Sequence, residues 1–187
     1  MSNSPKWRKA SNLNQSELPC SVKSWLLNED SLTSQLIKKS DGDFSVNVLR
    51  QEWTYSYISE EKILSLLPKQ ECLIREVLLH CHNEPWIYAR TVMPKSSLVD
   101  ELEYLRNFDN KPLGHVLFNT PGIKREAFEV AKLKNTDLPH YVNKSILESS
   151  NKKTNDENVF HWGRRSKFTA YNKNLLVNEI FLPNFRP

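Results

Sequence analysis

Short apolar runs with helical spacing alternate with extended segments along the chain. Two helices are predicted over "SVKSWLLNEDSLTSQLIKKS", because its apolar residues recur every three or four positions. Ser21 and Ser31 are placed to act as their N-caps. A third helix is predicted over "SSLVDELEYLRNF", in which Ser97 would be the N-cap and Leu102 and Leu105 share one side.

Alternating apolar residues predict the strands of a sheet. Residues 44–57 alternate on one parity through Val48 and on the other from Trp53, which predicts a bulge or a strand covered on both faces. Two further strands are predicted in "CLIREVLLHCH" and "EPWIYARTVMP", joined at Asn83. A last hairpin joins "RRSKFTAY" to "LLVNEIFLP" through residues 172–174. Hairpin-connected strands with few helices favour an α+β domain built on an antiparallel sheet.

Two segments lack this patterning. Residues 1–18 are polar and without periodicity, which predicts a mobile N-terminal tail ahead of a single domain over residues 19–187. Residues 133–160 are rich in Asn, Lys and Ser, which predicts a long loop or local insertion containing at most one weak helix. The segment "REAFEVAKL" before it could be a strand or a helix.

Length and composition favour one soluble domain. The 187 residues are 39% hydrophobic and 26% charged, with a net charge of +4. Lys and Arg are scattered among nearly as many acidic residues, which argues against a nucleic-acid partner. We find no signal peptide and no apolar run near the roughly 20 residues that span a bilayer, so we expect a cytoplasmic protein without membrane insertion.

The common motifs of metal and nucleotide enzymes are absent from the sequence. Cys20, Cys72 and Cys81 lack the CxxC spacing of zinc or redox sites and are predicted to be reduced thiols. The five histidines are dispersed, so no metal site is predicted. There is no phosphate-binding loop, dinucleotide fingerprint or GxSxG motif. We therefore expect a site that uses neither a metal nor a cofactor.

Charged residues inside apolar strands are the candidates for a site. Glu179 would share a face with Val177 and Phe181, where a carboxylate must be paired, hydrogen-bonded or kept neutral. It could serve proton transfer or ligand recognition, or it could be an edge residue or part of a structural ion pair. Arg75, in "LIREVLL", needs a planar anionic partner, which could be a ligand carboxylate or Glu179. Arg90 could be a second site residue or a solvated one.

Two adjacent arginines precede the last hairpin. In an extended strand Arg164 and Arg165 point to opposite faces, so at most one of them can reach a given pocket. The other is expected to be surface charge.

At these residues the sequence resembles the chorismate–pyruvate lyase family, bacterial enzymes that supply 4-hydroxybenzoate for ubiquinone synthesis. The matching segments, in the family's order, are "SWLLNEDSLT", "LIREVLL", "EPWIYARTVMP", "KPLGHVLF", "WGRRSKF" and "LLVNEIFLP". The resemblance implies one α+β domain with a six-stranded antiparallel sheet flanked by helices, and a ligand enclosed beneath helical flaps. It also implies elimination of pyruvate from chorismate without a cofactor, as the first committed step of ubiquinone biosynthesis.

The resemblance assigns roles to individual residues. Arg75 matches the family arginine that binds a ligand carboxylate, and Glu179 matches the glutamate at the other end of the site. Leu113, in "KPLG", matches a position that contacts ligand through its main chain, and Leu32 falls where a relative has Met. As a hypothesis, Arg90 meets the enolpyruvyl carboxylate. Arg75 and Glu179 are then the predicted catalytic residues of a monomer whose ligands are chorismate and 4-hydroxybenzoate.

A second class of protein fits the same pattern. The effector domains of certain bacterial transcription factors resemble this fold and bind small molecules without turning them over. Such domains normally follow a DNA-binding winged helix, whereas a short polar tail precedes Trp25. The alternatives to the enzyme are a non-catalytic sensor of a small aromatic carboxylate and an inactive relative that sequesters 4-hydroxybenzoate.

Overall fold

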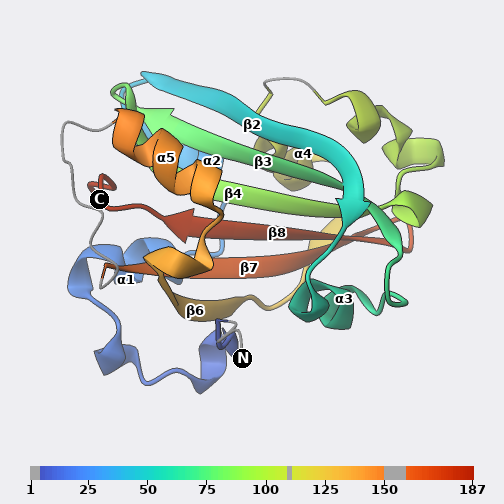
Figure 1. Cartoon of the computed structure of the whole chain (residues 1–187), viewed down its shortest axis with the longest axis horizontal. Helices are drawn as coiled ribbons and strands as arrows, with labels where there is room; N and C mark the ends of the chain where they lie inside the picture. The colour runs from blue at the N-terminus through green and yellow to red at the C-terminus, as the bar shows by residue number, and fades with distance from the viewer. Residues whose placement is uncertain (1–4, 109–110, 150–158) are drawn as a thin grey trace.

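The computed structural model describes residues 5–108, 111–149 and 159–187 and shows an antiparallel sheet with helices on both faces (Figure 1). Its strands pair in the order β1–β6–β7–β8–β4–β3–β2, and β5 pairs with β7. The strands are β1 (Arg8–Lys9), β2 (Phe44–Tyr55), β3 (Glu71–Cys81), β4 (Glu84–Pro94), β5 (Ile123–Arg125), β6 (Glu129–Lys134), β7 (Phe160–Ala170) and β8 (Lys173–Phe181). The predicted α+β class is confirmed. The sheet of the described residues has eight strands rather than six, because it includes the short strands β1 and β5.

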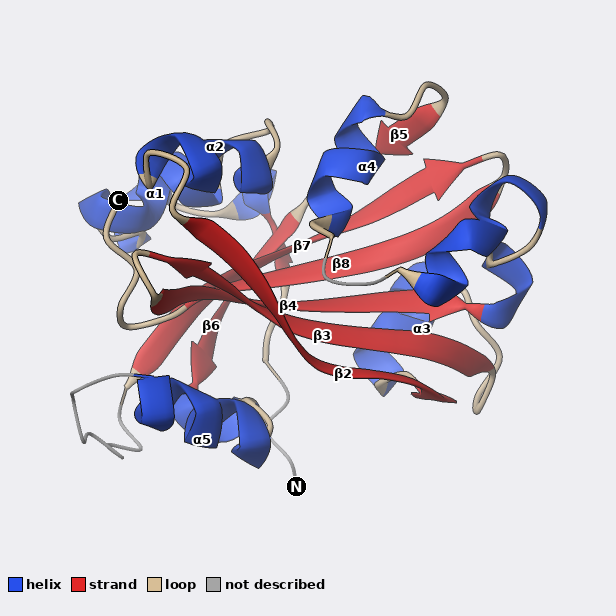
Figure 2. Ribbon diagram, turned by 90° about the horizontal axis from the view of Figure 1, so that it is seen from above, coloured by secondary structure: helices blue, strands red, loops and turns tan. Residues whose placement is uncertain are grey.

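Helices cover both faces of this sheet. The α-helices are α1 (Cys20–Leu26), α2 (Leu32–Lys39), α3 (Ile58–Leu64), α4 (Leu113–Asn119) and α5 (His140–Ser149). The 3₁₀ helices are η1 (Ala10–Asn12), η2 (Gln15–Glu17), η3 (Lys95–Ser97), η4 (Asp100–Asn107) and η5 (Asn135–Asp137). Figure 2 shows α1, α2 and α4 over one face and α5 over the other. We call the face that carries Arg75 and Glu179 the front face, and the face that carries Glu76 and Arg90 the back face.

Apolar side chains on alternate strand positions build a core on each face, as period-two patterning requires. On the front face, residues of α1 and α2 pack on the strands, namely Leu26, Leu32 and Leu36 against Val77, Leu79 and Ile87. On the back face, residues of α5 and the segment before it pack on the strands, namely Leu138, Val142 and Ile146 against Leu78, Tyr88 and Ile180. Both sides of the central strands are therefore buried.

Turns and a bulge set the strand registers. The parity slip predicted in β2 is confirmed as a register shift between Val48 and Arg50. The β3–β4 hairpin turns through His82 and Asn83, whose φ angles of 53° and 61° are those of a two-residue primed turn. The β7–β8 hairpin turns at residues 171–172, slightly earlier than predicted.

The predicted helix ends are partly right. Ser31 caps α2, because its side chain accepts a hydrogen bond from the backbone N–H of Ser34 at 3.3 Å. The prediction for Ser97 was wrong, since it ends η3 and the next helix is the 3₁₀ helix η4. Asp100, with φ of 51°, interrupts the regular helix that the spacing predicts. Leu102 is nonetheless fully buried, because a three-residue spacing also suits a 3₁₀ helix.

Both segments that lack patterning contain packed elements. In residues 5–18, β1 pairs with β6, and Leu13 and Leu18 are buried. The mobile tail over residues 1–18 stays a prediction. The segment 133–160 ends β6 and forms η5 and α5, while residues 150–158 lie outside the described residues.

Candidate active site

A pocket lies between the front face of the sheet and helices α2 and α4. Its enclosed cavity volume is about 30 Å³, within a recess of about 400 Å³ that includes open solvent. Its lining comprises Thr33 of α2, Pro112, Leu113 and Gly114 at the start of α4, and the strand residues Val46, Arg75, Val77, Leu79, Ala89, Thr91, Val177 and Glu179. The pocket therefore joins three predicted site residues, Arg75, Leu113 and Glu179.

Strand register sets the separation of the two charged residues in this pocket. Arg75 pairs with Thr91 and Thr91 with Val177, so Glu179 lies two strands across and two residues along from Arg75. With strands about 4.8 Å apart and about 3.4 Å per residue, their Cα atoms are about 12 Å apart. The pocket therefore has a guanidinium in one part of its wall and a carboxylate in another.

Arg75 is held in place by the segment that leads into α4. Its side chain is buried, and Nη2 donates a hydrogen bond to the backbone oxygen of Lys111 at 3.1 Å. The guanidinium also lies 5.6 Å from the ring centre of Phe108. Burial lowers the pKa of Arg75 to about 10, so it is still a cation at neutral pH. Arg75 can therefore bind an anion inside the pocket.

Glu179 forms an ion pair with Arg164, not with Arg75. Arg164 Nε donates to Glu179 Oε2 at 2.7 Å, while Arg164 Nη1 donates to the backbone oxygens of Trp25 at 3.0 Å and Asn28 at 2.6 Å. Arg164 is fully buried, whereas 18% of the Glu179 side chain remains exposed. The ion pair thus fixes a carboxylate at the pocket wall, and Arg164 links this wall to α1 and to the connection that follows it.

The two arginines ahead of the last hairpin point to opposite faces, as predicted. Arg164 is on the front face, and Arg165 is on the back face, where its Nε donates to Glu129 Oε2 at 2.8 Å. Arg165 is only 6% exposed, so the expectation that the second arginine is surface charge was wrong.

The two covering helices touch at Gly114. A Cβ atom at Gly114 would lie 2.6 Å from Thr33 Oγ1. Glycine is therefore needed for the close approach of α4 to α2 over the pocket. Leu113 lines the pocket beside Gly114. Leu32 does not line it: the side chain is buried in the front-face core, and the pocket residue of α2 is the adjacent Thr33.

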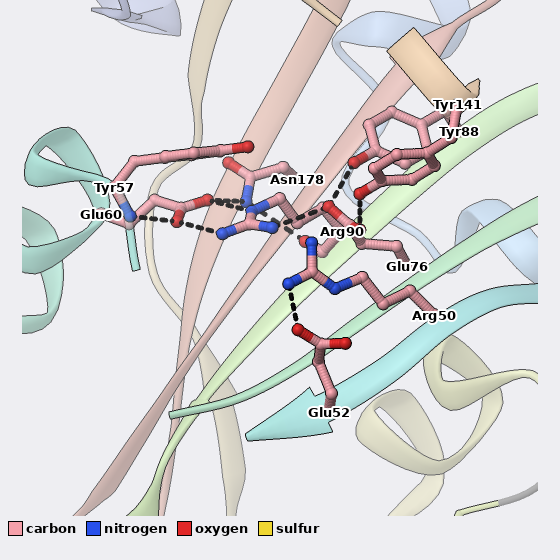
Figure 3. A network of polar contacts seen from close by, with 9 residues as sticks. All are labelled: Arg50, Glu52, Tyr57, Glu60, Glu76, Tyr88, Arg90, Tyr141 and Asn178. Carbon is pink, nitrogen blue, oxygen red and sulfur yellow. Dashed lines mark hydrogen bonds and ion pairs between the residues drawn. The ribbon is translucent and has the colours of Figure 1, made fainter. Parts of the chain in front are cut away.

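Arg90 lies on the back face, so the hypothesis that it meets a substrate carboxylate in this pocket was wrong. Its Nε donates to Glu60 Oε1 at 2.9 Å and its Nη1 donates to Glu76 Oε1 at 2.7 Å (Figure 3). The physical reason is a register shift between Leu79 and His80, which places Arg90 opposite Glu76. A one-residue shift of this kind moves a side chain to the other face of the sheet.

A buried polar network surrounds Arg90 (Figure 3). Tyr88 Oη donates to Glu76 Oε1 at 2.7 Å, and the Tyr141 hydroxyl also donates to Glu76. Burial alone would raise the pKa of Glu76, but hydrogen bonds from both tyrosines and the charge of Arg90 lower it. The Asn178 side-chain amide donates to Glu60 Oε1 and to the Arg90 backbone oxygen, both at 3.1 Å. This network joins α3, α5 and the central strands.

Arg125 is a further front-face arginine that is not among the predicted site residues. Its Nε donates to Ser166 Oγ at 2.8 Å and its Nη1 donates to the backbone oxygen of Glu29 at 2.9 Å. The only sequence signal is an arginine in "REAFEVAKL", whose periodicity fits neither element type clearly. Among the described residues, no group of three or more His, Cys, Asp and Glu is arranged to hold a metal ion.

Comparisons with known proteins decide the family. The family described as chorismate lyase matches residues 1–186. The chain belongs to the chorismate lyase family. A probable chorismate pyruvate-lyase of Psychromonas ingrahamii is 39% identical over 85% of this chain and 81% of its own. Another such protein, from Pseudomonas fluorescens, is 35% identical over 97% of this chain and 91% of its own.

Solved structures share the fold of this chorismate lyase family member at low identity. The C-terminal domain of a histidine utilization repressor from Pseudomonas syringae pv. tomato has a TM-score of 0.55 at 10% identity, covering 77% of this chain and 94% of that domain. The ligand-binding domain of a GntR-family regulator from Bordetella bronchiseptica has a TM-score of 0.53 at 10% identity, covering 78% and 88%. These likenesses show the fold alone, whereas the family match favours the enzyme over the sensor.

None of the helices in the described residues combines the length and apolar character needed to cross a membrane.

Proposed function

We propose that this chorismate lyase family member eliminates pyruvate from chorismate without a cofactor and releases 4-hydroxybenzoate. The observation that carries the proposal is the presence of Arg75 and Glu179 in one pocket beneath α2 and α4. Strand geometry places their Cα atoms about 12 Å apart. The proposal includes a cytoplasmic monomer whose product enters ubiquinone biosynthesis.

The substrate chemistry needs orientation more than it needs a cofactor. Chorismate is a cyclohexadiene with a ring carboxylate, a hydroxyl, and an enolpyruvyl ether on the carbon next to the hydroxyl. Breaking the ring carbon–oxygen bond of the ether and removing the proton from the hydroxyl-bearing carbon makes the ring aromatic. The released enolpyruvate takes up a proton and becomes pyruvate. Aromatisation supplies the driving force, and orientation can contribute up to about 7–11 kcal/mol to lowering a barrier.

The pocket residues take roles that fit this chemistry. Arg75 binds the ring carboxylate, as a buried guanidinium next to Leu113 at the start of α4 can. Glu179, fixed by Arg164, meets the hydroxyl end of the ring as hydrogen-bond partner or base. The main chain at Leu113 contacts the ligand from the start of α4.

Turnover by the purified protein tests the proposal directly. We expect chorismate alone, with no additions, to yield pyruvate and 4-hydroxybenzoate in equal amounts, followed by a coupled pyruvate assay and by chromatography. Binding of chorismate without either product would favour a sensor instead. Glu179→Gln should lower kcat by at least about 100-fold, the lower range for a positioned proton-transfer group. An unchanged kcat in that variant would remove Glu179 from the chemistry.

A further inference from the structure

Arg125 brings another guanidinium to the front face beside Glu179. The residue ends β5, and its Nε donates to Ser166 Oγ of β7 at 2.8 Å. Ser166 pairs with the pocket residue Val177, and Arg164, two residues earlier on β7, pairs with Glu179. The Arg125 side chain therefore contacts β7, the strand that pairs with β8, which carries Glu179.

Arg125 is held by aromatic rings and neutral oxygen atoms. Its guanidinium lies 5.1 Å from the ring centre of Phe128 and 5.5 Å from that of Phe118, and its Nη1 binds the neutral backbone oxygen of Glu29. Among the described residues, no carboxylate forms an ion pair with it. Burial lowers the pKa of Arg125 to about 10 and the charge of Arg164 lowers it further, while the charges of Glu179 and Glu29 oppose both. A half-buried guanidinium of this kind is suited to binding an anionic ligand.

The other arginines near the pocket have different roles. Arg164 is matched by Glu179 and by two backbone oxygens, and Arg90 is matched by two carboxylates on the back face. The proposed function assigns Arg75 to the ring carboxylate. Chorismate carries a second carboxylate, on its enolpyruvyl group, that still needs a partner.

The geometry of chorismate directs this second carboxylate to the Glu179 end of the pocket. The enolpyruvyl oxygen is bonded to the ring carbon adjacent to the hydroxyl-bearing carbon. With the ring carboxylate at Arg75 and the hydroxyl at Glu179, the enolpyruvyl group extends beside Glu179. Arg125 approaches this end of the pocket from β5.

We propose that Arg125 binds the enolpyruvyl carboxylate of chorismate, a role that rests on the proposed lyase function. When the ether bond breaks, its electron pair moves to the enolate oxygen of the leaving group, and the ring proton passes to a base. Arg125 would then lie close to the new negative charge, so it stabilises the departing enolpyruvate as well as the substrate. The product 4-hydroxybenzoate has no second carboxylate and makes no use of Arg125.

The test separates substrate from product. In Arg125→Gln we expect kcat/KM for chorismate to fall about 100- to 1,000-fold, as for a buried charge pair that loses one partner. The inhibition constant of 4-hydroxybenzoate should stay within about twofold of wild type, because the product lacks the group that Arg125 binds. Arg125→Lys should recover part of the loss. Lys124→Gln removes the same charge from an exposed position of the same strand and should leave both measurements unchanged.

Two results would overturn the role of Arg125. One is a parallel loss of chorismate turnover and of 4-hydroxybenzoate affinity in Arg125→Gln, which would mean that the side chain holds the shape of the pocket. The other is a kcat/KM equal to that of wild type. If Arg125→Gln does not fold, the wild-type protein supplies the test through 3-carboxymethoxy-4-hydroxybenzoate. This dicarboxylate should bind at least tenfold more tightly than the methyl ester of its ether side chain, and equal affinities would refute the proposal.

The proposed function can fail separately. If wild-type protein binds chorismate but forms no product, the lyase proposal falls. Calorimetric binding of chorismate and of 4-hydroxybenzoate to wild type and Arg125→Gln then still decides whether Arg125 recognises the second carboxylate.

Discussion

Replacing Arg90 by methionine should destabilise the fold without weakening substrate binding. Arg90 is 5% exposed and holds two carboxylates, Glu60 and Glu76, which are 3% and 0% exposed. Its guanidinium also lies 4.1 Å from the ring centre of Tyr57. Methionine fills a similar space but leaves both carboxylates buried without a cation.

The magnitude follows from the contacts that remain. Removing one partner of a buried ion pair typically costs 3–5 kcal/mol, and Arg90 serves two partners. The cost is limited because Glu76 still accepts hydrogen bonds from Tyr88 and Tyr141, and Glu60 still accepts one from Asn178. We therefore expect a loss of about 4 kcal/mol in the free energy of unfolding at pH 7. At about 2–4 °C per kcal/mol for a chain of this length, Tm should fall by about 8–16 °C.

Urea denaturation, monitored by circular dichroism, measures this loss of stability. Steady-state kinetics at 20 °C measures KM for chorismate, which should stay within about twofold of the wild-type value. The control Arg186→Met breaks an exposed pair with Glu84 and should cost less than about 1 kcal/mol. A loss below about 1 kcal/mol in Arg90→Met would refute the reasoning about the buried network. A tenfold rise in KM at unchanged Tm would place Arg90 at the substrate after all.

Two further predictions concern pH and the pocket cover. His161 is 2% exposed, and burial lowers its pKa to about 4, so the unfolded chain (pKa near 6.5) takes up the proton first as the pH falls. The contribution of His161 to the free energy of unfolding is therefore full above pH 6.5, and about 3 kcal/mol is lost as the pH falls toward 4. Urea denaturation across this range should show that the free energy of unfolding depends less steeply on pH in His161→Gln than in wild type. Equal slopes would contradict the assignment. Gly114→Ala should lower the free energy of unfolding by about 1–3 kcal/mol and raise KM for chorismate, because the new Cβ would collide with Thr33 Oγ1. Adding Thr33→Ala should reverse most of both effects. If the double variant is no better than Gly114→Ala, the contact is not the cause.

Sequence patterning predicts which residues of one strand lie on the same face of the sheet. It does not predict which residues of the neighbouring strand lie on that face with them. The turn at His82 and Asn83 pairs Cys81 with Glu84. If this register continued along the hairpin, the numbers of every two paired residues would sum to 165. In that register Arg75 would be opposite Arg90, and both would face the same pocket. The shift beside His80 changes the sum by one and separates them. Pro85 pairs with His80 at this point, and proline, which has no N–H for the ladder, is typical of bulges.

Long-range partners were beyond what the sequence could supply. The cost of burying Glu179 predicts that it has a partner, and Arg164 is found there because β7 pairs with β8 in one particular register. Arg125 lies at the end of β5, a strand of three residues that carries too little periodicity to be predicted. Two local signals, the Ser31 cap and the slip in β2, were predicted correctly because neighbouring residues determine them, whereas the cap predicted at Ser97 was wrong.

The front face of the sheet carries the pocket and the back face carries the buried polar network, and β4 contributes residues to both faces. Its residues Ala89 and Thr91 line the front pocket, while Arg90 between them joins the back-face network. Because Asn178 of β8 donates to Glu60 and to the Arg90 backbone, the network stabilises the same strands that carry Glu179. Loss of Arg90 should then lower activity only as the variant begins to unfold. Its rate at 20 °C should match wild type, and its activity should disappear at a temperature lower by the same 8–16 °C that separates the two Tm values. A rate already reduced at 20 °C would show that the network also sets the geometry of the pocket.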